Sequence, residues 1–95
     1  MNLHEVIQNP VVSEKTMYAE ADGKYTFKVD MGANRLQVRE AVQALYDVEV
    51  ASVRILVMPA KTRRRGNRVF IRSPKWKKAV VTLAEGETIN VYEGD

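Results

Sequence analysis

Residues 24–30 read Lys-Tyr-Thr-Phe-Lys-Val-Asp, an unbroken alternation of polar and apolar side chains. Successive side chains of an extended chain point to opposite sides, so Tyr25, Phe27 and Val29 share one face. The polar residues between them share the other face. This pattern predicts a β-strand that buries one face and leaves the other in water. The rest of the chain therefore has to supply neighbouring strands and a cover for the apolar face.

Three further strands are expected, over residues 48–58, 78–83 and 88–92. Pro59 closes the first of them, and a turn at residues 85–86 separates the last two. The inward side chains of the first are expected to be Ala51, Val53, Ile55 and Val57, and those of the last Ile89 and Val91. Strands joined by short turns favour an antiparallel sheet.

Three helix starts can be recognised from capping residues. Asn2, Ser13 and Asn34 each offer a side-chain oxygen to the backbone N–H groups of a first helical turn. Pro10 ends the first helix and Gly23 the second. The third helix carries one apolar stripe at helical spacing, formed by Val38, Ala41, Val42 and Leu45.

This order of elements predicts an α/β (α+β) fold. We expect one domain over residues 1–95, with a four-stranded antiparallel sheet, helices packed on one face of it, and a long basic arm at residues 59–75. The open face of the sheet is expected to be polar and partly basic, because three cations fall on it: Lys28, Arg54 and Lys78.

The strongest charge feature is a stretch at residues 61–78 with nine basic residues and no acid. The nine are Lys61, Arg63, Arg64, Arg65, Arg68, Arg72, Lys75, Lys77 and Lys78. The whole chain has 15 basic and 12 acidic residues, so six basic residues face 12 acidic ones in the remainder. Such a block repels itself, and a polyanion such as nucleic acid supplies the missing charge.

Three readings of the arm at residues 59–75 remain open. It could be a bare solvated loop, an RNA-binding arm, or a β-ribbon that extends the flanking strands. The apolar patch at residues 69–71 argues against a bare loop, because the ring of Phe70 can stack on an unpaired base while arginines hold phosphates. Trp76 is expected to anchor the rim of the core, with RNA contact as the alternative.

Other classes of protein find little support in the composition. The chain has no cysteine and a single histidine, His4, and its acids form no recognisable acid–base pair or metal site. We therefore expect neither an enzyme nor a cofactor, a metal or a small-molecule substrate. No apolar run approaches the ~20 residues that span a bilayer, and the N-terminus has no signal-peptide pattern. An intracellular, soluble protein without membrane association is expected.

Several segments together resemble one known family. They are Val12-Ser13-Glu14-Lys15, residues 23–29, residues 40–42, residues 48–50, the arginine-rich arm, and Trp76-Lys77-Lys78-Ala79-Val80-Val81-Thr82-Leu83 followed by Glu85-Gly86. In this order they resemble the bacterial-type ribosomal protein L23 family. The resemblance covers nearly the whole chain, and its Ser-Glu-Lys and Trp-Lys-Lys-Ala motifs at this spacing are highly specific.

The resemblance implies a function that composition alone does not. It implies a cytoplasmic, ribosome-bound protein that binds large-subunit rRNA beside the exit of the nascent-peptide tunnel, with its arm reaching toward the tunnel. It implies ribosomal protein L29 as a neighbour and a docking surface for trigger factor and the signal recognition particle. The glutamate of the Ser-Glu-Lys motif, Glu14 here, belongs to that docking surface in the family.

The expected RNA-binding residues are the nine cations of residues 61–78 together with Lys28, Arg54 and Phe70. Two alternatives belong to other classes: a free RNA- or DNA-binding regulator on a similar sheet, and an adaptor whose basic arm binds an acidic protein. Cell fractionation distinguishes them, because a ribosomal protein stays with the large subunit through a high-salt wash.

Overall fold

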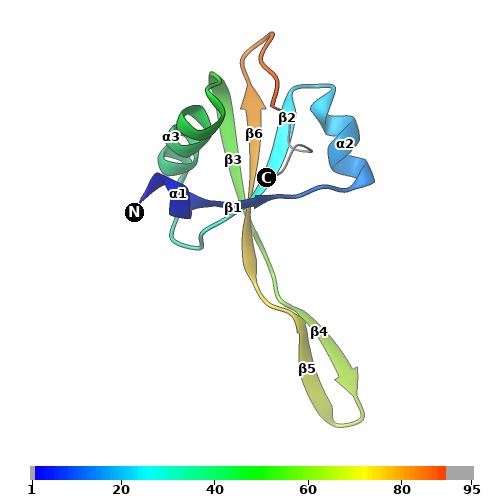
Figure 1. The fold of residues 1–95 in the computed structure, drawn as a ribbon. Helices are drawn as coiled ribbons and strands as arrows, with labels where there is room; N and C mark the ends of the chain where they lie inside the picture. Colours follow the sequence, from blue (N-terminus) through cyan, green and yellow to red (C-terminus); the bar gives the residue numbers. More distant parts are fainter. Residues whose placement is uncertain (1, 90–95) are drawn as a thin grey trace.

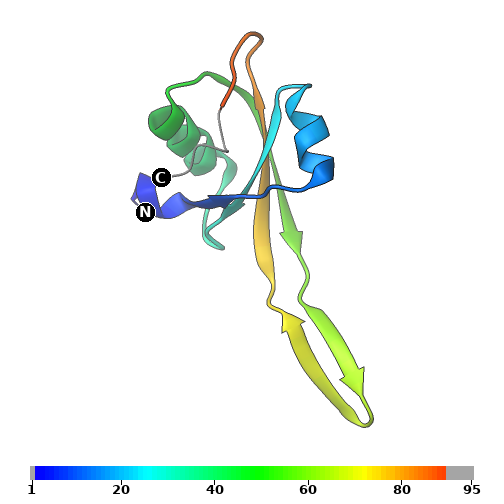
Figure 2. The same ribbon diagram turned by 45° about the vertical axis from the view of Figure 1, so that its right-hand side comes forward.

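A computed structural model describes residues 2–89 and shows a four-stranded antiparallel sheet, three helices around it, and a two-stranded hairpin that projects from one end (Figures 1 and 2). The elements are α1 (Leu3–Val6), β1 (Ile7–Pro10), α2 (Glu14–Glu20), β2 (Lys24–Val29), α3 (Arg35–Tyr46), β3 (Val50–Met58), β4 (Lys61–Arg65), β5 (Arg68–Ser73) and β6 (Trp76–Leu83). The strand order in the large sheet is β1-β2-β6-β3, and β4 pairs only with β5. We call the sheet with its three helices the body, and β4–β5 the hairpin.

The strand predicted over residues 24–30 lies in the centre of the sheet as β2. Tyr25, Phe27 and Val29 are buried, and the residues between them are exposed or half-buried. Phe27 is opposite Ala79 of β6 and packs its ring 5.7 Å from that of Tyr46 at the end of α3. Burial raises the pKa of the Tyr46 hydroxyl above its usual value. The alternation along β2 thus places Phe27, the largest fully buried side chain among residues 2–89.

Helix α3 covers the apolar face of the sheet, together with α1 (Figure 1). Asn34 caps α3 as predicted, and Gln37 completes a capping box: the Asn34 side chain accepts from the Gln37 N–H at 2.8 Å, and the Gln37 side chain accepts from the Asn34 N–H at 3.0 Å. Three residues of the predicted stripe are buried, and the fourth, Leu45, lies at the margin with 39% of its surface exposed. The sequence therefore located both the start of α3 and its buried side.

Helix α2 does not join the other two helices. It lies against β2 on the opposite face, where the side chains of Lys15, Thr16 and Ala19 meet the polar residues of the sheet. The predicted Ser13 cap is present, with Thr16 completing a capping box. Val12 and Met17, on either side of this cap, are not buried: 49% and 52% of their surfaces are exposed. The prediction that helices cover one face holds for α1 and α3 alone.

The fourth strand of the sheet is β1, in a segment that the sequence analysis assigned to a helix ending at Pro10. The helix is a single turn, and the chain then pairs with β2, placing Ile7 opposite Val29 and Pro10 opposite Phe27. Pro10 is tolerated because β1 is an edge strand, where one side of the backbone needs no ladder partner.

The strand expected over residues 88–92 is wrong for Thr88 and Ile89, which are not in a strand, and residues 90–92 lie outside the described residues. Ile89 is nevertheless buried, as predicted, and its N–H donates to the Tyr25 hydroxyl at 3.2 Å. The predicted inward position of Val91 also lies outside the described residues. The segment after β6 therefore contributes to the core through one side chain.

The strand expected over residues 48–58 begins at Val50 and contains an irregularity. The register with β6 shifts between Val50 and Ser52, which leaves Ala51 exposed where an inward side chain was predicted. Val53 and Ile55 pack against the core as expected. Val57 lies on the same face but is 50% exposed.

Candidate nucleic-acid interface

The arm forms a β-ribbon, one of the three conformations considered for it, because β4 pairs with β5. Arg65 is opposite Arg68, and Gly66 takes a positive φ of 62° in the two-residue turn between them. Glycine adopts this conformation without a steric penalty, and a positive φ at the first turn residue is typical of a type II′ hairpin. Every residue at positions 61–72 is exposed. The strands are therefore joined by backbone pairing, and their side chains remain in solvent.

The register sorts the hairpin side chains onto two different faces. Arg63 is opposite Phe70, and side chains two residues apart along a strand point to the same side. One face, which we call the arginine face, therefore carries Arg63, Arg65, Arg68, Phe70 and Arg72. Four of these five residues line a shallow hollow of about 260 Å³: Arg63, Arg65, Phe70 and Arg72. The ring of Phe70 is 48% exposed, so a flat ligand can reach it between guanidinium groups.

The opposite face of the hairpin has a different chemistry. Thr62 pairs with Ile71 and Arg64 with Val69, so this face holds one cation and two aliphatic side chains. Val69 and Ile71 are 64% and 71% exposed. The apolar patch of residues 69–71 is therefore divided by the pleat, with Phe70 on one side and its neighbours on the other.

The body presents a second basic surface on the face of the sheet away from α3, which we call the basic face. Lys28 of β2 is directly opposite Lys78 of β6, and Arg54 of β3 is opposite Val80, one step along the same face. Like charges directly opposite each other destabilise a sheet. The structure thus brings together the three sheet cations that the sequence placed on one face. An anion bound over Lys28 and Lys78 would relieve the repulsion between them.

Two cations of this surface were missed by the sequence analysis. A groove of about 410 Å³ runs between α2 and the basic face, and Lys15 of α2 and Lys24 of β2 line it beside Arg54 and Lys78. Lys24 could have been assigned from the alternation of β2. Lys15 could not, because nothing in the local pattern shows that α2 crosses the polar face.

The remaining predicted residues lie near the junction of the hairpin and the body. Trp76 is half-buried on the basic face, two residues before Lys78, and lines a hollow of about 250 Å³ together with Lys28 and Pro74. It is not among the side chains that pack against the core, where it was expected. Lys61 and Lys75 are exposed at the base of the hairpin. Lys77 points to the opposite face from Lys78, where its ammonium group donates to the Ala33 carbonyl at 3.0 Å. The structure therefore separates Lys77 from the other predicted RNA contacts.

Within residues 2–89, none of the nine cations of residues 61–78 forms a salt bridge. The same part of the chain holds no cluster of His, Asp or Glu side chains arranged for a metal ion. No helix in it is long and apolar enough to cross a membrane. The charge of the hairpin is thus uncompensated by the described part of the protein.

Glu14 lies at the start of α2 and is exposed. Its carboxylate accepts from the Tyr18 hydroxyl at 3.5 Å, one turn along the helix. Tyr18 is 72% exposed and Met17 52%. Whereas Lys15, Thr16 and Ala19 line the groove toward the sheet, this outer side of α2 offers an acid beside two large apolar side chains to solvent.

Comparison with known proteins points to one family. The family profile described as "Ribosomal protein L23" matches residues 5–91. The chain is 44% identical over 96 residues to the large ribosomal subunit protein uL23 of Thermotoga maritima, covering 100% of this chain and 94% of the relative. It is 40% identical over 94 residues to the protein of the same name from Roseiflexus castenholzii, covering 99% of both chains.

Proposed function

Because this chain belongs to the ribosomal protein L23 family, and is therefore a structural constituent of the large ribosomal subunit rather than an enzyme, we propose that it holds large-subunit rRNA with the hairpin and the basic face. The single observation that carries this proposal is the arginine face. It presents four guanidinium groups around one exposed aromatic ring, and the side chains of these strands are not packed into a core.

The two basic surfaces suit different parts of an RNA. Guanidinium groups bind phosphate oxygens in pairs, and the exposed face of Phe70 can stack on a base that is not paired. We assign the hairpin cations, Phe70 and Lys75 to this contact. On the body, Lys28, Arg54 and Lys78 approach the phosphate backbone, and Lys15 and Lys24 extend their groove. Lys77 supports the sheet through Ala33 instead of reaching RNA.

The family resemblance supports a proposal for the position of the protein on the subunit. We propose that the protein lies beside the exit of the nascent-peptide tunnel, with the hairpin directed toward the tunnel and ribosomal protein L29 as a neighbour. The outer side of α2 would then be a docking surface for trigger factor and the signal recognition particle. An exposed carboxylate next to Met17 and Tyr18 is suited to a partner with a basic group and an apolar contact.

Fractionation of cells on a density gradient tests the proposal. A constituent of the large subunit sediments with it and remains there through a high-salt wash, because many contacts must break at once. A free regulator or a basic-arm adaptor would be released at high salt, since contacts that are mainly ionic weaken steeply with salt. Release of the chain from the large-subunit fraction in the wash would overturn the proposal.

A further inference from the structure

Strand β3 forms one edge of the sheet, and no strand of residues 2–89 pairs with its outer side. The Leu83 N–H of β6 donates to the Gly23 carbonyl on the β2 side. Since ladder bonds alternate along a strand, Thr82, Val80 and Lys78 direct theirs toward β3. Their partners on β3 are Ser52, Arg54 and Leu56. The backbone groups of Val53, Ile55 and Val57 consequently point outward from the sheet.

The beginning of this edge is already satisfied by side chains of α3. The Val50 N–H donates to the Gln43 side chain at 3.2 Å, and the Val50 carbonyl accepts from the Arg39 guanidinium at 3.0 Å. Helix α3 thus protects the edge up to the bulge at Ala51. Beyond the bulge, the outward groups of Val53, Ile55 and Val57 lack such cover from α3. A long open edge is a template for another strand.

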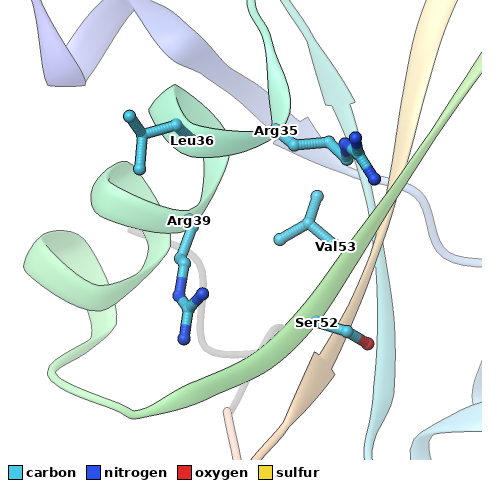
Figure 3. A pocket seen from close by; sticks show the side chains of 5 residues that line it. All are labelled: Arg35, Leu36, Arg39, Ser52 and Val53. Carbon is cyan, nitrogen blue, oxygen red and sulfur yellow. The ribbon is translucent and has the colours of Figure 1, made fainter.

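A hollow of about 350 Å³ lies beside this open edge, between β3 and the outer flank of α3, and is lined by Arg35, Leu36, Arg39, Ser52 and Val53 (Figure 3). In this view Val53 lies between the two arginines. Leu36 is 63% exposed, and Arg35 has no hydrogen bond or salt bridge to any of residues 2–89. None of the lining residues is an acid. A strand added to β3 would point every second side chain into this hollow.

We propose that β3 and the flank of α3 form a protein-binding edge that accepts an extended acidic segment of a partner protein by strand addition. Its backbone would pair with the outward groups of Val53, Ile55 and Val57. On the side facing α3, an apolar side chain would pack on Val53 and Leu36, with acidic side chains on either side of it to meet Arg35 and Arg39. Backbone pairing supplies affinity in this mode, and the side-chain pockets supply specificity.

The side chains around this edge favour an acidic protein segment over a second copy of the chain and over RNA. A second copy of the chain would bring its own Arg35, Arg39 and Arg54 against the first set, and such like-charge contact opposes pairing. RNA would find an apolar floor of Val53 and Leu36 between the two arginines, which suits an apolar side chain and not a phosphate. The edge is also separate from the basic face, since α3 covers the other side of the sheet. Strand addition therefore stands independently of the proposed RNA contact.

Nuclear magnetic resonance of the full chain labelled with ¹⁵N tests this inference. The probe is a short blocked peptide in which a valine is flanked on the same face by two glutamates, with threonines at the intervening positions. We expect it to shift the amide signals of Val53, Ile55 and Val57 and to slow their hydrogen exchange, while the hairpin amides do not respond. The same peptide with lysines in place of the glutamates should leave β3 unchanged.

Two substitutions separate side-chain from backbone recognition. Arg35→Glu should weaken the glutamate peptide by about fivefold or more, the change expected for one lost and reversed surface ion pair. Arg64→Glu on the hairpin is the matched control and should leave this affinity unchanged. Val57→Pro removes one outward N–H, and an edge strand tolerates proline there, so it too should weaken binding.

Three results would overturn the inference. They are no response of β3 at saturating glutamate peptide, equal binding of the lysine peptide, and displacement of the glutamate peptide by a short RNA that shifts the same amides. The last result would assign the edge to RNA.

Discussion

The sheet of the body and the hairpin both pair antiparallel strands, but only the sheet buries side chains. Phe27 in β2 is completely buried and touches α3, whereas Phe70 in β5 has 48% of its surface in solvent. An isolated two-stranded hairpin is marginal in water, and a row of like charges weakens it further. The body therefore has a core of its own, whereas the hairpin has none and carries positive charge that residues 2–89 do not neutralise. The same antiparallel pairing thus builds a core in one region and presents charged side chains to solvent in the other.

The largest expected effect comes from the same substitution made in both regions. Phe27→Ala should lower the free energy of unfolding by about 3–5 kcal/mol, because it removes a buried ring and leaves a cavity. Phe70→Ala should change it by less than about 0.5 kcal/mol, since no buried contact is lost. Denaturant titration of both variants measures the difference. A similar loss in both would mean that the hairpin belongs to the folding unit.

The next effect concerns order within the hairpin. Because the charges of residues 61–73 repel one another and no core holds them, we expect this segment to be mobile in the free protein and fixed on RNA. Backbone amide relaxation should give order parameters below about 0.6 for the free hairpin and near 0.85 in the complex. Amides of β2 provide the internal control and should stay rigid in both states. A free hairpin as rigid as β2 would show that the paired strands stay fixed without RNA, and would contradict ordering on binding.

The smallest effect on folding is expected at Glu14. Glu14→Ala should lower the free energy of unfolding by about 1 kcal/mol at most, because only a first-turn charge and its contact with Tyr18 are lost. Incorporation into large subunits should be unchanged, while the affinity of those subunits for trigger factor should fall. Normal incorporation with wild-type affinity would limit Glu14 to starting the helix. Lys15→Ala is the neighbouring control and should reduce RNA binding without affecting trigger factor.

Local patterns in the sequence were sufficient where each residue's surroundings are set by its own segment. The alternation of residues 24–30 and the helix caps at Ser13 and Asn34 need no distant information, and all three are present. The same alternation separates Lys77 from Lys78, so the sequence could have placed these two predicted RNA contacts on opposite faces of the sheet. In the structure, Lys77 lies on the same face of β6 as the buried Ala79 and Val81, and its ammonium group donates to the Ala33 carbonyl.

Features that arise from pairing between distant segments could not be predicted from local sequence patterns. Strand β1 has only four residues, lacks an alternating pattern and ends in proline, so its pairing with β2 is visible only in three dimensions. The groove that joins Lys15 to the basic face depends on how α2 crosses the sheet. The two faces of the hairpin depend on the register that places Arg63 opposite Phe70. Each of these features arises from contacts between segments distant in the chain.

The salt dependence of RNA binding tests most directly the claim that the hairpin holds rRNA through its arginines. Each phosphate contact contributes about 0.7–0.9 to the slope of log affinity against log salt concentration. Replacing Arg63, Arg64 and Arg65 with alanine should therefore reduce the slope for a large-subunit rRNA fragment by about 2–3. The free energy of unfolding should stay within about 0.5 kcal/mol of wild type, because all three side chains are exposed. A variant that folds normally and keeps the wild-type slope would contradict the assignment of the hairpin as the main phosphate contact.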